Sequence, residues 1–193
     1  MQLPRCVRIN ADDARSAAAL ADGGWREIEI LETWQHRVPW YVESPPHIDM
    51  ATKADLDRCL EIGAVAFWAD RLHSDPMVLK HDADEARAEW IRAAFGSDQG
   101  AILVCRDKGA DPPHGFIILR CDPVDGRTRV DLIAVHPDHQ RRGEASCLLK
   151  AALNWGPRGN WLRAGTSSVN EPARRLYASM GMHKTREQRT FHK

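Results

Sequence analysis

The amino-acid sequence predicts an α+β or α/β fold, in which helices flank one mixed central sheet. A length of 193 residues with 43% hydrophobic and 28% charged residues is ordinary for a soluble globular chain that can bury a core. Three strand-like segments follow one another, and a β-α-β unit comes after them. We expect the three strands at 101–106, 115–121 and 128–136, the next helix at 142–155 and the next strand at 161–166.

The first 45 residues predict a small strand–helix–strand unit. Asp13 can cap a helix over 14–21, and residues 27–30 alternate as a half-buried strand does. About 35–40 residues cannot build a stable core alone, so we expect this unit to dock on the rest of the chain. The predicted division is 1–45 and 46–193, with a linker marked by Pro39, Pro45 and Pro46.

The main part predicts a short strand followed by two helices before the three-strand segment. Thr52 with Asp55 has the pattern of a capping box, which opens the first of these helices. After the β-α-β unit we expect one more helix and a closing extended segment. The expected positions are a strand at 47–50, helices from 52 to about 68, at 82–95 and at 171–180, and an extended segment at 182–191.

Charge is balanced overall but uneven along the chain. The 27 basic and 27 acidic residues give a net charge of zero, which argues against a general nucleic-acid binder. Residues 126–193 hold 13 of the basic residues and 5 of the acidic ones. This excess indicates either an anionic ligand in the last third or basic side chains that only decorate exposed helices.

The cysteines, the apolar runs and the N-terminus together indicate the cellular compartment of the protein. The five cysteines are scattered without a metal-ligand spacing, so we expect reduced thiols, no metal and a cytoplasmic protein. The longest apolar run, near 62–69, is far shorter than the roughly 18 residues of a membrane span. The N-terminus shows no signal-peptide pattern.

The stretch after the third strand predicts an anion site. A strand ends at Val135, Pro137 breaks it, and the segment Gln140-Arg141-Arg142-Gly143-Glu144-Ala145 leads into an amphipathic helix. The first N–H groups of a helix have no partner within it, and the helix dipole is positive there. Gly143 allows close approach to the backbone, and the two arginines add charge. An ordinary helix cap on a surface loop is the alternative reading.

A second helix with distinctive residues follows the β-α-β unit. Asn170 is a good N-cap, and Gly181 suits the end of the helix. The apolar face contains Ala173, Leu176, Tyr177 and Met180. A tyrosine on such a face is often only a core aromatic, but Tyr177 is one of two tyrosines in the chain and follows the anion-binding unit.

Together these two segments resemble the acetyl-CoA-dependent N-acetyltransferases of the GNAT superfamily, over about residues 47–193. The resemblance implies that segment 140–145 binds the pyrophosphate of acetyl-CoA, although Ala145 stands where glycine is commonest. It implies that the strand at 128–136 splays from the strand at 161–166. The pantetheine arm would lie in that gap and contact the backbone of Ile133, Ala134 and Val135 together with Asn170 and Ala173.

The resemblance also implies the reaction. A substrate amine attacks the thioester directly, and Tyr177 acts as general acid that protonates the departing sulfur. A hydroxyl with a pKa near 10 is protonated at neutral pH, which suits that role. The general base is open: Asp131 and His136 flank the expected cleft, each could instead be structural, and a water path is the third option.

The acceptor is expected to be a small primary amine. The N-terminal part loosely resembles nucleotide-sugar amine acetyltransferases of the TDP-fucosamine type, as do residues 67–71, 75–76 and 89–91, so an amino sugar is one candidate. Polyamines, aminoglycosides and peptide N-termini are others. The competing function is a non-catalytic acyl-CoA sensor of the same fold. We expect no nucleic-acid or membrane partner, and a homodimer is an open option.

Overall fold

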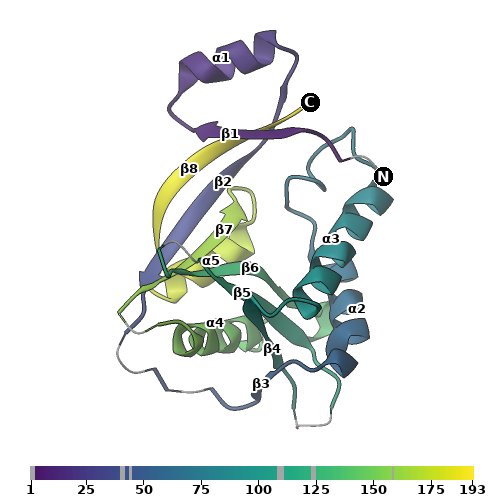
Figure 1. The fold of residues 1–193 in the computed structure, drawn as a ribbon, viewed down its shortest axis with the longest axis vertical. Coiled ribbons are helices and arrows are strands. Elements are labelled where there is room, and N and C mark those ends of the chain that lie inside the picture. The colour runs from purple at the N-terminus through teal and green to yellow at the C-terminus, as the bar shows by residue number, and fades with distance from the viewer. Residues whose placement is uncertain (1–2, 40–41, 44, 108–110, 123–124, 158) are drawn as a thin grey trace.

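One eight-stranded sheet organises the protein. The computed structural model describes residues 3–39, 42–43, 45–107, 111–122, 125–157 and 159–193. The sheet has the order β1-β8-β2-β7-β6-β5-β4-β3, and helices pack against it (Figure 1). The strands are β1 Cys6–Asn10, β2 Arg26–Arg37, β3 Ile48–Met50, β4 Gly100–Cys105, β5 Gly115–Cys121, β6 Thr128–Val135, β7 Trp161–Ser167 and β8 His183–His192. The helices are α1 Ala14–Asp22, α2 Leu56–Ala66, α3 Lys80–Phe95, α4 Glu144–Trp155 and α5 Glu171–Ser179, with short 3-10 turns at Lys53–Asp55 and Pro137–His139. The prediction of a mixed α+β fold is confirmed.

Local capping explains where the helices begin. The Asp13 carboxylate accepts a hydrogen bond from the Ser16 N–H at 3.0 Å, and the Asp55 carboxylate accepts one from the Thr52 N–H at 2.8 Å. The first predicted helix of the main part ends at Ala66 rather than 68, because Phe67 has an extended backbone. The helix predicted from 142 begins at Glu144, because Gly143 has a left-handed φ of 89°. The predicted turn at 122–126 includes positions 123–124, which lie outside the described residues.

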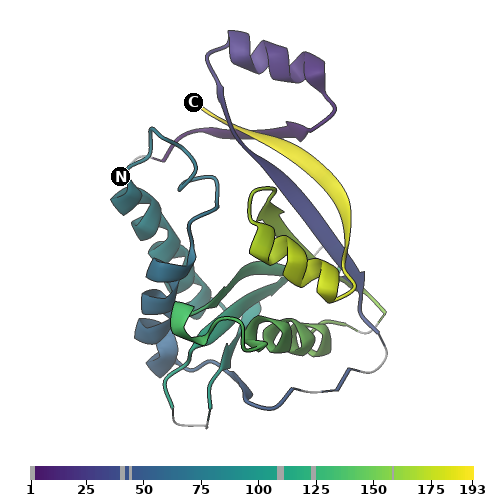
Figure 2. The ribbon, with the colours of Figure 1, turned by 180° about the vertical axis from the view of Figure 1, so that it is seen from behind.

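Each face of the sheet has its own core cluster. On one face, Leu148, Leu149 and Ala152 of α4 and Tyr177 of α5 pack with Leu103 and other strand residues. In Figure 2, α4 and α5 lie in front of the sheet. On the other face, Cys59 and Ile62 of α2 and Ile91 of α3 pack against Ile102, Val104, Phe116 and Leu132. The helices of the β-α-β half therefore share one face, and the helices before the three-strand segment share the other.

The N-terminal strand–helix–strand elements form as expected, but their second strand has an internal place in the sheet. β2 lies between β7 and β8 and is antiparallel to both, while β1 pairs with β8 at the edge. The alternation of β2 predicts that its isoleucines face the core and its glutamates face solvent. In the structure Glu29 is buried instead and Ile30 is exposed. A register shift between Glu27 and Glu29 accompanies this reversal. The division at residue 45 stays a prediction.

A buried ion cluster joins β2 and β8 to the segment between α2 and α3. The Asp75 carboxylate is fully buried and lies 2.7 Å from the Arg26 guanidinium and 2.8 Å from Nδ1 of His192. Such a carboxylate is stabilised only because it is paired on both sides. These contacts attach the segment at residues 67–79 to β2 and β8.

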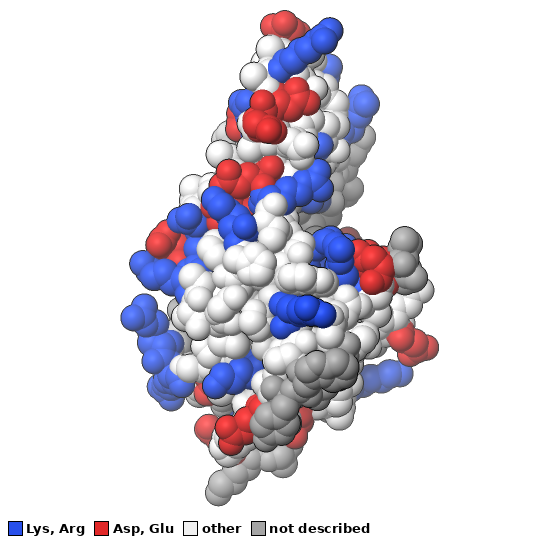
Figure 3. Space-filling model, turned by 90° about the vertical axis from the view of Figure 1, so that its left-hand side faces the viewer, with Lys and Arg blue, Asp and Glu red and all other residues white. Residues whose placement is uncertain are grey.

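None of the helices in the described ranges is long and apolar enough to cross a membrane. On the face seen in Figure 3, basic side chains are interleaved with acidic ones over the upper part and separated by uncharged surface in the middle.

Limited proteolysis tests how firmly the first 45 residues are held. Because β2 is hydrogen-bonded on both sides, native protein should resist cleavage within residues 8–33. The first cuts should fall in the proline-marked linker at 39–46. Mass spectrometry of the fragments gives the positions, and rapid cleavage within 8–33 of folded protein would contradict the expectation.

Candidate active site

The parallel strands β6 and β7 separate partway along their length. They pair at Thr128 with Leu162, at Arg129 with Arg163 and at Val130 with Ala164, and no pair follows. β6 continues to Val135 with β5 as its only strand neighbour in the described sheet. The backbone of Ile133, Ala134 and Val135 therefore lies along an edge that is open toward β7. Such an edge can hydrogen-bond an extended ligand.

The loop at the end of this open edge, residues 140–145, has the geometry of an anion site and is called the anion loop below. Arg141 has a φ of 64° and Gly143 a φ of 89°, so two left-handed residues alternate within the turn. Within the described chain, the N–H groups of Arg142, Gly143, Glu144 and Ala145 have no backbone acceptor. They precede the first intrahelical hydrogen bonds of α4, where the helix dipole is positive.

Side chains of the loop hold its shape. The Gln140 amide donates to the Val135 carbonyl at 3.1 Å, which ties the loop to the end of β6. The Arg142 guanidinium donates to the Asp138 carbonyl at 2.8 Å, so this arginine supports the turn from within. A Cβ built at Gly143 meets no atom within 4 Å, and the need for glycine comes from its positive φ rather than from crowding.

Glu144 and Ala145 point away from the loop. The Glu144 carboxylate lies 3.7 Å from Nδ1 of the buried His114. Ala145 is half-buried and packs against the α4–α5 core cluster. Only the backbone N–H groups of Glu144 and Ala145 are therefore available to a ligand. The Glu144 carboxylate does not face the position that a phosphate would occupy.

The helix α5 brings Asn170, Ala173 and Tyr177 to the α4–α5 side of the sheet. Asn170 accepts a hydrogen bond from the Ala173 N–H at 3.3 Å, and this cap begins the helix. Tyr177 is 2% exposed and belongs to the same core cluster as Val130 and Ala164, the last paired residues of β6 and β7. Burial raises the pKa of the Tyr177 hydroxyl.

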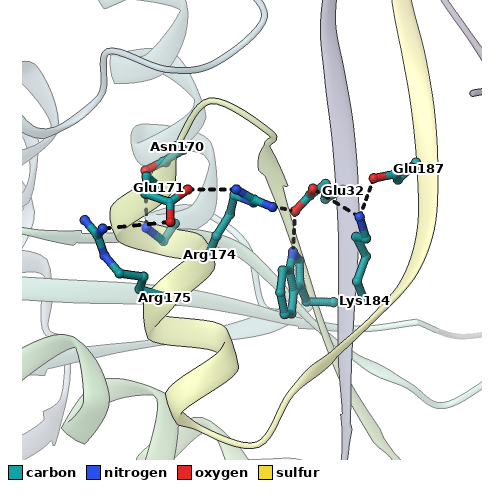
Figure 4. A network of polar contacts seen from close by, with 9 residues as sticks. Glu32, Asn170, Glu171, Arg174, Arg175, Lys184 and Glu187 are labelled. Carbon is teal, nitrogen blue, oxygen red and sulfur yellow. Dashed lines mark hydrogen bonds and ion pairs between the residues drawn. The ribbon is translucent and has the colours of Figure 1, made fainter.

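A carboxylate of β2 holds α5 in place. The Glu32 side chain is 2% exposed and accepts hydrogen bonds from Nε of Arg174 at 3.0 Å and from Nε1 of Trp34 at 3.0 Å (Figure 4). Nζ of Lys184 lies 3.4 Å from its second oxygen. The Trp34 ring in turn packs on Tyr177 with 6.2 Å between ring centroids.

The sequence analysis assigned no role to Glu32 or Trp34. A glutamate on an alternating strand is expected to face solvent, and only the placement of β2 beside β7 buries it. Its basic partners on α5 and β8 are more than 140 residues away in the chain. No local pattern reveals this network.

The two candidate bases are engaged in other contacts. The Asp131 carboxylate pairs with Nε of Arg129 at 2.6 Å through one oxygen and with Arg120 at 2.9 Å through the other. It faces α3 and lines a small pocket with Trp90. His136 lies at the far end of β6, where its Nδ1 is 3.6 Å from the Asp138 carboxylate.

The site thus combines an open parallel strand pair, a loop with unpaired N–H groups at its end and a buried tyrosine on the next helix. The model of the acetyltransferase (GNAT) family matches residues 64–182, which is more than half of the chain. The chain therefore belongs to this family, whose members generally use acetyl-CoA. No protein of curated function matches it by sequence.

Solved structures show the same fold. A GCN5-related N-acetyltransferase from Sphaerobacter thermophilus superposes with a TM-score of 0.65 at 17% identity, over 98% of this chain and 60% of its own. A GNAT-family protein from Novosphingobium aromaticivorans gives 0.57 at 19% identity, over 87% and 66%. An aminoglycoside 6′-N-acetyltransferase from Acinetobacter haemolyticus gives 0.52 at 18% identity, over 72% and 91%.

The GNAT fold prediction is thus confirmed. The chain spans less than two thirds of the length of the first two proteins, 60% and 66% respectively. The identities are low, so these similarities concern the fold and leave the acceptor undetermined.

Loss of the loop geometry should weaken CoA binding. In the double variant Arg142→Ala/Gly143→Ala, the turn loses its internal support and a side chain must adopt a positive φ. Left-handed strain costs roughly 1–2 kcal/mol and a charge-assisted hydrogen bond about 1.5–3 kcal/mol. We expect CoA affinity to fall by at least about tenfold, the equivalent of 1.4 kcal/mol. Titration calorimetry measures it.

The matched control is Arg92→Ala. This arginine on α3 is half-exposed and pairs with Glu85, so its removal changes the same amount of charge away from the loop. It should leave CoA affinity unchanged. Equal CoA affinity of the loop variant and the parent would show that the loop is not part of the CoA-binding site.

Proposed function

We propose that this protein is an N-acetyltransferase that moves an acetyl group from acetyl-CoA to a primary amine by direct attack. The observation that carries the proposal is the open edge of β6, with free N–H groups at one end and with Tyr177 buried in the core cluster that also holds the last paired residues of β6 and β7. In this reading, the backbone of Ile133, Ala134 and Val135 binds the pantetheine arm. The N–H groups at Arg142–Ala145 bind the pyrophosphate, and exposed Arg141 adds positive charge.

An orphan polar group supports this placement. The Ser167 hydroxyl at the end of β7 is buried and has no hydrogen-bond partner among the described residues. It lies three residues beyond Ala164, the last residue of β7 that pairs with β6. A buried hydroxyl without a partner is unfavourable, and an amide-bearing ligand between the strands would satisfy it.

The reaction needs one proton donor and one proton acceptor. The amine nitrogen attacks the thioester carbon, a C–N bond forms, and the C–S bond breaks with its electron pair on sulfur. Tyr177 donates its hydroxyl proton to that sulfur and regains one from solvent. Because burial raises its pKa, the hydroxyl is protonated throughout the neutral range.

The proton that the amine loses requires a separate acceptor. Asp131 would have to give up an ion pair with Arg129 or Arg120 before it could take a proton. These pairs favour water as the acceptor over Asp131. His136 is held near Asp138 at the other end of the strand.

For the acceptor we propose a small amine, with a free or nucleotide-linked amino sugar as the first candidate. The Acinetobacter haemolyticus protein, an aminoglycoside 6′-N-acetyltransferase, shows that this fold is compatible with such an acceptor. The nucleotide-linked form has no support beyond the resemblance of the N-terminal part. A polyamine or a peptide N-terminus is the next candidate.

We also propose that the protein has no nucleic-acid or membrane partner. Two of the aromatic side chains in the basic last third, Tyr177 and Phe191, are 2% exposed and cannot stack on bases. We also propose a cytoplasmic location and, as one option, a homodimer.

A thiol-release assay tests the function. Acetyl-CoA is incubated with the protein and a panel that contains TDP-linked amino sugars, free amino sugars, aminoglycosides, polyamines and short peptides. Release of CoA that depends on one amine class establishes transfer and identifies the acceptor. Tight CoA binding without release for any amine would favour the alternative, a non-catalytic acyl-CoA sensor.

Tyr177→Phe should lower turnover without affecting cosubstrate binding. The ring and its contact with Trp34 remain, but the proton donor is lost, and general-acid help is typically worth about 10²–10⁴-fold. We expect that loss mostly in kcat, with unchanged CoA affinity. A kcat within about threefold of the parent would make Tyr177 a core residue only.

The pH profile provides an independent check. Burial raises the pKa of Tyr177 above its ordinary value near 10, so its proton is retained as pH rises. The kcat profile measured with a saturating amine should show no alkaline loss below about pH 10 from this group. An alkaline limb near pH 8–9 that disappears in Tyr177→Phe would show that the hydroxyl ionises earlier than its burial predicts.

A further inference from the structure

Three polar side chains meet between the sheet and the first turn of α4, on the inner side of the anion loop. Cys105 ends β4, His114 directly precedes β5, and Glu144 begins α4. One ligand atom from each, a sulfur, a ring nitrogen and a carboxylate oxygen, lie within 4.8 Å of one another. Cys105 is fully buried and His114 is 5% exposed.

The backbone of His114 is hydrogen-bonded on both sides, whereas its imidazole ring has no hydrogen bond in the described structure. Its backbone N–H donates to the Cys105 carbonyl at 2.9 Å, and its carbonyl accepts from the His136 N–H at 2.8 Å. Both ring nitrogens are buried without a hydrogen-bond partner in the described structure. An imidazole has a donor or acceptor to satisfy at each nitrogen, and leaving both unmet in the interior is unfavourable.

The two carboxylates beside this ring lie just beyond hydrogen-bonding distance. Oε1 of Glu144 is 3.7 Å from Nδ1, and Oδ1 of Asp107 is 3.5 Å from Nε2. The spacing on the Nδ1 side leaves room for an atom bonded to both groups. The carboxylate on the Nε2 side is where a metal-ligating histidine commonly has its supporting partner.

We propose that Cys105, His114 and Glu144 bind a divalent transition-metal ion of the zinc class. Thiolate, imidazole and carboxylate are the three ligand types that zinc accepts together, and three protein ligands leave a fourth position for water. A thiolate and a carboxylate carry two negative charges, which a divalent cation neutralises in the interior. The His139 ring stacks on His114 at 4.3 Å between centroids and covers the site from the loop side.

The sequence analysis expected no metal because no ligand spacing is visible. The ligands lie far apart in the sequence, at positions 105, 114 and 144, and only the packing of α4 against the ends of β4 and β5 brings them together. A bound ion would tie the first turn of α4 to the ends of β4 and β5, directly behind the anion loop. This bracing role rests on the proposed function, whereas metal binding itself does not.

Cobalt serves as the spectroscopic probe. The chain is treated with a chelator, and Co²⁺ is titrated into the folded protein. We expect one Co²⁺ per chain with a thiolate-to-cobalt charge-transfer band in the near ultraviolet, and Zn²⁺ should displace it. Loss of a residue that only supports a metal ligand lowers metal affinity roughly 10–100-fold. Cys105→Ser, His114→Gln and Glu144→Gln remove the ligands themselves, so each should lower Co²⁺ affinity by at least as much.

Cys59→Ser is the matched control, because Cys59 is also fully buried but lies in the cluster on the opposite face of the sheet. It should bind Co²⁺ as the parent does. A chain in which the other four cysteines are replaced by alanine keeps Cys105 as its single thiol, and it covers the case in which Cys105→Ser fails to fold. The band must persist in that protein.

The proposal is overturned if the folded parent shows no thiolate band, or if Cys105→Ser binds Co²⁺ as tightly as the parent. Zn²⁺ should also raise the midpoint of thermal unfolding of the parent and not that of Glu144→Gln. These readouts do not involve acetyl-CoA. A failed thiol-release assay would therefore leave the metal result intact, and the reverse also holds.

Discussion

Peptide groups in the middle of a sheet must be hydrogen-bonded, and strands that separate leave some without partners. In this protein β6 and β7 pair only as far as Val130 and Ala164, while β5 on one side and β2 on the other hold them in the sheet. The remaining arrangement follows from this gap. α4 begins at its open end with free N–H groups, and α5 places Tyr177 in the core cluster that also contains Val130 and Ala164. A ligand that is extended, amide-bearing and anionic at one end complements all three features.

The gap is maintained by a strand from the other end of the chain. β2 pairs with β7, and its buried Glu32 bonds to Arg174 of α5 and to Trp34, which packs on Tyr177. A buried carboxylate is tolerable only with such partners, so the position of α5 depends on β2. The N-terminal residues thus contribute to the site even though none of them belongs to the family motif, and the family match begins only at residue 64.

The anion loop combines local strain with support from its surroundings. Two left-handed residues aim its N–H groups outward, and Gln140 and Arg142 hold the turn by bonding to backbone carbonyls. Glu144, in the first turn of α4, would repel a phosphate if it faced the loop, but its side chain turns toward His114. The backbone N–H of Glu144 thus belongs to the loop, while its carboxylate belongs to the polar cluster around His114.

The sequence by itself determined the elements and the anion loop. Apolar periodicity, the caps at Asp13 and Asn170, and the glycine at 143 are local signals, and most helices and strands lie within a few residues of their predicted places. The strand predicted at 27–30 is the exception, because β2 continues to Arg37. What only the tertiary structure decided are contacts between distant segments. It places β2 between β7 and β8, buries Glu32 and Glu29, pairs Asp131 with two arginines and brings Cys105, His114 and Glu144 together. The physical reason is that local patterns report which side of an element is apolar, whereas partners of buried polar groups depend on which elements become neighbours.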